Sequence, residues 1–116
     1  MENTAFLQSK NMVRDINILN DICKFYNKSV SDVITDSRKR EFVEIRQIFM
    51  HFLQTELKAY QREASLIFGQ SRLMSRHSKK TINNLRQTDK SFKLKHDELL
   101  AKLAITYKNQ RIKRHD

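Results

Sequence analysis

Glycine and proline, the residues that most often interrupt helices, are nearly absent from this chain. Its 116 residues contain one glycine, Gly69, and no proline. The remainder is rich in Leu, Ile, Lys, Arg, Glu and Gln, which favour helix interiors. Gly69 tolerates a positive φ, so it is the best candidate for the corner of a helix–turn–helix. We therefore predict a single all-α domain, a compact bundle of about six helices.

Apolar positions at three- and four-residue spacing divide the chain into helices. The predicted divisions are a flexible arm at 1–11, the domain at 12–107 and a basic tail at 108–116. The expected helices cover residues 12–27, 30–35, 41–59, 60–68, 71–87 and 89–107. Ser29 or Ser31 can cap the second helix, Ser71 can cap the helix after Gly69, and Thr88 or Asp89 can cap the last. The widest apolar face belongs to 41–59, which is therefore predicted to be the central helix.

The formal net charge is +10, from 23 Lys and Arg residues against 13 Asp and Glu residues. A bias of this size favours a polyanionic partner, nucleic acid first and an anionic membrane surface second. The alternative is a basic protein that is merely soluble. The charge is most one-sided between Phe68 and Arg86, where five basic residues face no acid. We expect this stretch to form a helix that presents cations to a polyanion.

A helical wheel divides the stretch 71–87 into two sides. The predicted buried side holds Met74, Ser78, Ile82 and Leu85. The predicted cationic side holds Arg72, Arg76, Lys79, Asn83 and Arg86, with Lys80 as a further cation of the same helix. One apolar stripe backed by one cationic stripe is typical of a helix that packs on a core and binds a polyanion.

Cys23 is the only cysteine, so neither an internal disulfide nor a cysteine-based metal site can form. It lies on an apolar helical face, where we expect a buried small hydrophobe. The N-terminal residues lack the pattern of a signal peptide, and no apolar run approaches the roughly 20 residues that span a bilayer. We expect a cytoplasmic protein, associated with the nucleoid when bound to DNA.

Candidate catalytic and metal-ligating groups are sparse. His77 is expected to be a packed or hydrogen-bonded residue, and the other histidines, His51, His96 and His115, are isolated and lack ligand-like spacing. Nothing resembles a nucleophile, a carboxylate pair or a cofactor-binding loop. We therefore expect no enzyme activity, no metal, no cofactor and no small-molecule substrate.

The order of the parts is similar to the C-terminal DNA-binding domain of the bacterial replication initiator DnaA. Three stretches carry the resemblance, and the match covers about Met12 to Leu103. The stretches are SRKREFVEIRQIFMHFL (37–53), FG (68–69) and HSKKTINNLRQTDKSFK (77–93). The resemblance implies a helix–turn–helix of the Trp-repressor type that acts in replication initiation, origin recognition or its regulation. The chain lacks a G-x-x-x-x-G-K-[ST] loop, so it resembles a stand-alone domain without the initiator's ATPase.

The resemblance also implies roles for single residues. Arg38 takes the place of a family arginine that enters the minor groove. Arg46 and Gln47 match a pair that contacts backbone phosphates. The family's base-reading signature, Asp-His-x-Thr, corresponds to Ser71, Arg72, Leu73 and Met74, so its polar readers are replaced here.

The residues themselves leave alternatives open. Arg72 and Arg76 lie one turn apart, and either could donate two hydrogen bonds to guanine or simply contact phosphates. Leu73 could touch a thymine methyl group or belong to the core. The cluster Arg38, Lys39 and Arg40 could enter a minor groove or remain a solvated loop. Arg46 and Gln47 could be only the polar stripe of their helix.

Together these features predict a protein that binds double-stranded DNA, with the helix at about 71–87 in the major groove. The expected contacts come from Arg38, Lys39, Arg40, Arg46, Gln47, Ser71, Arg72, Leu73, Met74, Arg76, Lys79 and Lys80. Other replication or regulatory proteins are further candidate partners, and no membrane is expected to be one. The alternative is a protein-interaction module that kept the fold and lost specific DNA recognition.

Overall fold

The computed structural model describes residues 10–35, 38–69 and 72–107. Within these ranges the chain forms six α-helices and one 3₁₀ turn, with no strand. The elements are α2 (Lys10–Phe25), α3 (Val30–Ile34), α4 (Arg40–Thr55), α5 (Gln61–Ser65), η1 (Leu66–Phe68), α6 (Arg72–Thr88) and α7 (Lys90–Tyr107). The all-α prediction is confirmed. Residues 1–9 of the predicted arm and the whole predicted tail, residues 108–116, lie outside the described residues.

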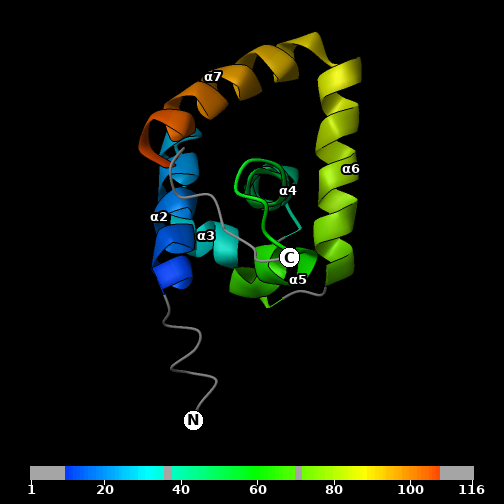
Figure 1. Ribbon diagram of the computed structural model, residues 1–116. Helices are drawn as coiled ribbons and strands as arrows, with labels where there is room; N and C mark the ends of the chain where they lie inside the picture. Colours follow the sequence, from blue (N-terminus) through cyan, green and yellow to red (C-terminus); the bar gives the residue numbers. More distant parts are fainter. Residues whose placement is uncertain (1–9, 36–37, 70–71, 108–116) are drawn as a thin grey trace.

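The predicted central helix is indeed the middle of the molecule. α2, α7 and α6 surround α4 on three sides, with α3 and α5 near its ends (Figure 1). Ile48, Phe49 and Leu53 of α4 are fully buried. The Phe49 ring meets Phe68 edge to face at 5.4 Å between centroids. Burial of these large side chains, each worth about 1.5–3 kcal/mol, makes α4 the element on which the others pack.

α2 begins at Lys10, two residues before the predicted start, and ends at Phe25. Asn27 adopts φ 58°, a left-handed conformation that stops a helix. Of the two serines predicted to cap α3, Ser29 is the N-cap: its hydroxyl accepts a hydrogen bond from the Asp32 backbone N–H at 3.2 Å.

The prediction placed the end of the central helix at residue 59, which is wrong, because α4 ends at Thr55. Lys58 adopts φ 62°, and the Ala59 backbone N–H reaches back to the Leu53 carbonyl at 2.9 Å. Composition gave no signal for this turn, since neither glycine nor asparagine marks it. Gly69, by contrast, has φ 65° between η1 and α6, as predicted.

α6 and α7 meet at a tight corner. The Asp89 carboxylate accepts a hydrogen bond from the Phe92 backbone N–H at 3.0 Å, which confirms its predicted role as the cap of α7. From this corner α7 crosses to α2, where Leu99 and Leu103 are buried. The Tyr107 hydroxyl closes the contact by donating to the Asp21 carboxylate at 2.6 Å.

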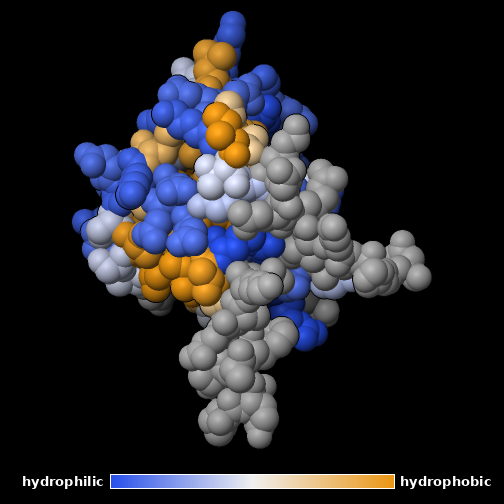
Figure 2. Space-filling model, turned by 60° about the vertical axis from the view of Figure 1, so that its left-hand side comes forward, coloured by the Kyte–Doolittle hydropathy of each residue, from blue (hydrophilic) through white to orange (hydrophobic). Residues whose placement is uncertain are grey.

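Seen from the side of α2, the described surface is mostly hydrophilic, and apolar side chains form separate patches (Figure 2). The exposed apolar residues of α2 and α3 are Val13, Ile16 and Ile34. Scattered apolar residues of this kind are ordinary on protein surfaces. None of the helices described has both the length and the apolar character needed to cross a membrane.

Candidate nucleic-acid interface

The outward face of α6 is cationic. Its exposed polar positions include Arg76, Lys79, Lys80, Asn83 and Asn84. No acidic residue occurs anywhere in α6. Within the described ranges, Arg76, Lys79 and Lys80 form no ion pair with a carboxylate. These three charges are therefore available to an external anion.

The inward face of α6 includes two small residues that let it lie close to α4. Ser75 and Ser78 are fully buried, and their hydroxyls lie 3.6 and 4.0 Å from the Met50 sulfur. The Gln54 amide donates to the Ser75 carbonyl at 2.9 Å. Because Ser75 faces α4, the helix is rotated so that Met74 is 39% exposed, and the prediction that Met74 is buried is wrong.

The first turn of α6 coincides with the expected base-reading signature. The sequence left two alternatives for Leu73, contact with a thymine methyl group or a place in the core. Leu73 is 64% exposed, so it does not belong to the core. Arg72 is the first residue of the helix, but its side chain is outside the described part of the structure. Ser71, the expected N-cap, also lies outside it. A pair of exposed apolar side chains, Leu73 and Met74, thus lies at the first turn of α6.

The predicted cluster before α4 lies beside α6. Arg38, Lys39 and Arg40 are all exposed. A hollow of about 420 Å³ separates this cluster and the start of α4 from the second half of α6. Its polar lining consists of Arg38, Arg40, Glu44, Gln47, Thr81 and Asn84. Three residues expected at the interface, Arg38, Arg40 and Gln47, therefore share one surface feature with α6.

Arg46 has a different environment from Gln47. It is buried, at 7% exposure, and its guanidinium donates to the backbone carbonyls of Val33 at 2.8 Å and Thr35 at 3.1 Å. These carbonyls belong to the C-terminal end of α3, where intrahelical partners are missing. Arg46 therefore joins α3 to α4. Its burial comes from tertiary packing, which helical spacing does not reveal.

Arg86 was predicted on the cationic face, which is wrong, because it turns toward α7. Its guanidinium pairs with the Asp97 carboxylate at 2.8 Å and donates to Nδ1 of His96 at 2.8 Å. Asn83 accepts a hydrogen bond from Nε2 of His51 at 2.8 Å. Arg86 and Asn83 thus tie α6 to α7 and α4 respectively.

Two histidines that the sequence separates by 45 positions meet in the interior, so the prediction that they are isolated is wrong. The rings of His51 and His96 lie edge to face with centroids 5.5 Å apart. Burial lowers the pKa of His96 to about 4, and the nearby charges of His51 and Arg86 act in the same direction. Burial also lowers the pKa of His51. Both imidazoles are therefore neutral near pH 7.

The tautomers of this histidine pair follow from its hydrogen bonds. Nδ1 of His96 accepts from Arg86, so the neutral ring carries its proton on Nε2. Nε2 of His51 donates to the Asn83 oxygen, which leaves Nδ1 as an acceptor. The buried Nε2 of His96 and Nδ1 of His51 have no partner among the described residues. No cluster of three potential metal ligands occurs in that part of the chain.

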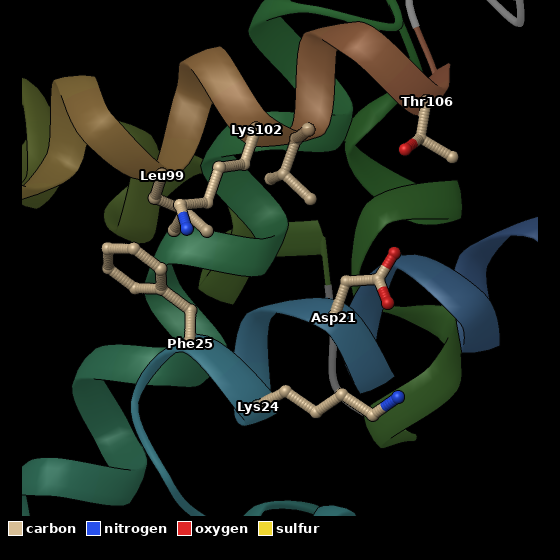
Figure 3. A pocket seen from close by; sticks show the side chains of 7 residues that line it. Asp21, Lys24, Phe25, Leu99, Lys102 and Thr106 are labelled. Atoms are coloured by element: carbon tan, nitrogen blue, oxygen red, sulfur yellow. The ribbon is translucent and has the colours of Figure 1, made fainter.

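A second hollow, of about 410 Å³, lies between α2 and α7. Asp21, Lys24 and Phe25 face Leu99, Lys102 and Thr106 across it (Figure 3). The ammonium group of Lys102 lies 5.8 Å from the centroid of the Phe25 ring. One carboxylate and two ammonium groups therefore share the lining of this hollow.

The described structure therefore brings together Arg38, Arg40 and Gln47 with the second half of α6, and it separates them from buried Arg46. Sequence reasoning missed Thr81 and Asn84, whose side chains line the same hollow. Helical spacing does place both on one flank of α6, but neither carries a charge that would draw attention. Comparisons with models of protein families, with curated proteins and with solved structures found no match.

Proposed function

We propose that this chain binds double-stranded DNA through a helix–turn–helix. In this proposal α5 and η1 form the first arm, Gly69 lies in the turn, and α6 enters the major groove. The observation that carries the proposal is the outward face of α6, where exposed Arg76, Lys79 and Lys80 have no acidic neighbour on the helix. Cations that contact DNA phosphates release condensed counterions, which drives binding.

Dimensions and position support the same proposal. α6 has 17 residues, and a helix of that length is about 25 Å long. The major groove is about 12 Å wide and admits an α-helix. Arg38 and Arg40 extend the cationic surface beyond α6. The resemblance to the DNA-binding domain of DnaA assigns DNA contacts to the same loop and helix, and it would place binding at a replication origin or in its regulation.

A pair of charge-removing variants tests the proposal. Arg76→Ala removes an exposed cation from α6, and Lys24→Ala removes an exposed cation from α2, on another side of the molecule (Figure 1). We expect Arg76→Ala to weaken duplex binding and to reduce the salt slope of log affinity by about 1. We expect Lys24→Ala to leave that slope unchanged. Fluorescence anisotropy of a labelled duplex measures both, and equal effects of the two variants would contradict the proposed face.

The alternative of a protein-interaction module has one observation in its favour. Leu73 and Met74 present apolar surface at the first turn of α6, where an apolar partner could dock. That function predicts weak, sequence-independent duplex binding even at low salt. Selection from a random duplex library separates the two functions, because only a DNA-reading α6 enriches a defined sequence.

A further inference from the structure

The hollow between α4 and α6 gathers hydrogen-bond donors, most of which have no side-chain partner among the described residues. Its lining includes the guanidinium groups of Arg38 and Arg40, the side-chain amides of Gln47 and Asn84, and the hydroxyl of Thr81. Within the described ranges, Arg38, Arg40, Gln47 and Asn84 make no side-chain hydrogen bond or ion pair. The Thr81 hydroxyl has only a long contact, 3.4 Å, with Nε2 of His77. Such a set suits a ligand rich in acceptor oxygens.

The charge of the hollow also favours an anion. Two guanidinium groups stand against one carboxylate, that of Glu44. Guanidinium groups form the strongest hydrogen bonds with phosphate and carboxylate oxygens. The hollow, about 420 Å³, has room for a phosphate group with several waters, since one water takes roughly 30 Å³.

The position of the hollow indicates where such a phosphate would come from. Asn84 lies on α6 eleven residues after Leu73 and four after Lys80, so the three side chains follow one line along the helix. All three are exposed. A helix in the major groove is flanked on each side by a phosphate backbone. The hollow therefore lies where one backbone would pass if α6 occupies the groove.

We propose that this hollow is a phosphate-binding site, in which Arg38 and Arg40 on one wall and Thr81 and Asn84 on the other bind one phosphate group. The inference rests on the proposed function for the source of the phosphate, a DNA backbone. Thr81 and Asn84 determine where along α6 the backbone is held. These two uncharged side chains thereby acquire a positioning role that the cations of α6 do not provide.

Neutral phosphates in the duplex test the site directly. Single phosphates of a bound duplex are replaced in turn by methylphosphonate, which removes the charge and one acceptor oxygen. We expect one replacement to weaken binding of the unmodified protein by about ten-fold, as for loss of a hydrogen bond to a charged group. Asn84→Leu and Thr81→Val should each reduce that sensitivity, because each removes one donor to the phosphate while Arg38 and Arg40 remain. Fluorescence anisotropy measures the affinity of each protein for the unmodified duplex and for the duplex with one methylphosphonate.

Matched controls separate this effect from folding and general affinity. Asn17→Leu on α2 and Thr106→Val on α7 make the same chemical changes at exposed positions away from this hollow. They should keep the full ten-fold sensitivity. Glu44→Gln should tighten duplex binding, because it removes the carboxylate from the lining, whereas Glu98→Gln on α7 should have a smaller effect. Retention of full sensitivity by both Asn84→Leu and Thr81→Val would overturn the proposal.

A second measurement distinguishes this site from the proposed function. Inorganic phosphate is added to the protein while the side-chain amide resonances of Gln47 and Asn84 are followed by NMR. We expect saturable shifts of these resonances, and loss of the Gln47 shift in Asn84→Leu. Shifts without any duplex binding would sustain the phosphate site and contradict DNA as its source. Absence of both would overturn the site itself.

Discussion

Acid is expected to destabilise the fold through His96. This residue is fully buried, and its pKa of about 4 lies below the ordinary value of 6.5. Between these two pH values the unfolded chain binds more protons than the native chain, so stability falls as the pH falls. The contribution is complete above about pH 6.5 and is lost as the pH falls toward 4. The full effect is about 3 kcal/mol, and about 2 kcal/mol is already lost at pH 5.

Other groups titrate in the same range, so a difference between variants is needed. Burial raises the pKa of Asp15 to about 6, which makes the native chain bind more protons than the unfolded one and acts in the opposite direction. Burial lowers the pKa of His51, which adds to the effect of His96. Subtracting the pH dependence of a His96 variant removes both contributions, provided that the variant is folded.

Urea unfolding of the protein and of His96→Gln at pH 7 and pH 5 provides the measurement. Glutamine keeps an acceptor for Arg86 and does not titrate. We expect the unmodified protein to lose about 2 kcal/mol more than His96→Gln between the two pH values, a large share of a typical stability of about 5–15 kcal/mol. Equal losses would refute the assignment of a neutral, buried His96.

The remaining predictions concern single side chains. Arg46→Ala should lower the free energy of unfolding by about 3 kcal/mol, because it leaves the Val33 and Thr35 carbonyls without their donor; unchanged stability with weakened duplex binding would instead favour a phosphate contact. Gly69→Ala should cost about 1 kcal/mol in urea unfolding, since φ is 65° and no atom lies within 4 Å to add a clash. Leu73→Ala should leave stability within about 0.5 kcal/mol of the original, as should Leu94→Ala at equal exposure on α7. If Leu73 touches a thymine methyl group, only Leu73→Ala should abolish the preference for a thymine over a deoxyuridine at one position of the selected site.

The parts of the fold that were predictable depend on local signals. Gly69 marked a turn because positive φ is easy only for glycine. Asp89 marked a helix start because its side chain can satisfy a free backbone N–H. The apolar width of α4 identified the central helix. The turn at Lys58 escaped prediction, because a lysine with φ 62° is set by the packing around it.

The candidate site was predictable in its charges and not in its contacts. Exposed Arg76 and Lys80 follow from helical spacing. The burial of Arg46 does not, because it depends on the end of α3 lying against α4. Nor does the meeting of His51 and His96, which needs α4 and α7 to cross. Such long-range placement also made Thr81 and Asn84 invisible as lining residues of one hollow.

The salt dependence of duplex binding tests the central claim most directly. Arg38, Arg40, Arg76, Lys79 and Lys80 are the exposed cations of the proposed surface. If Arg38 and Arg40 share one phosphate and each of the other three cations meets another, log affinity should fall linearly with log salt, with a slope of roughly −3 to −4, between about 50 and 200 mM salt. A slope near zero, or no measurable duplex binding at the lowest salt, would contradict DNA binding by this surface.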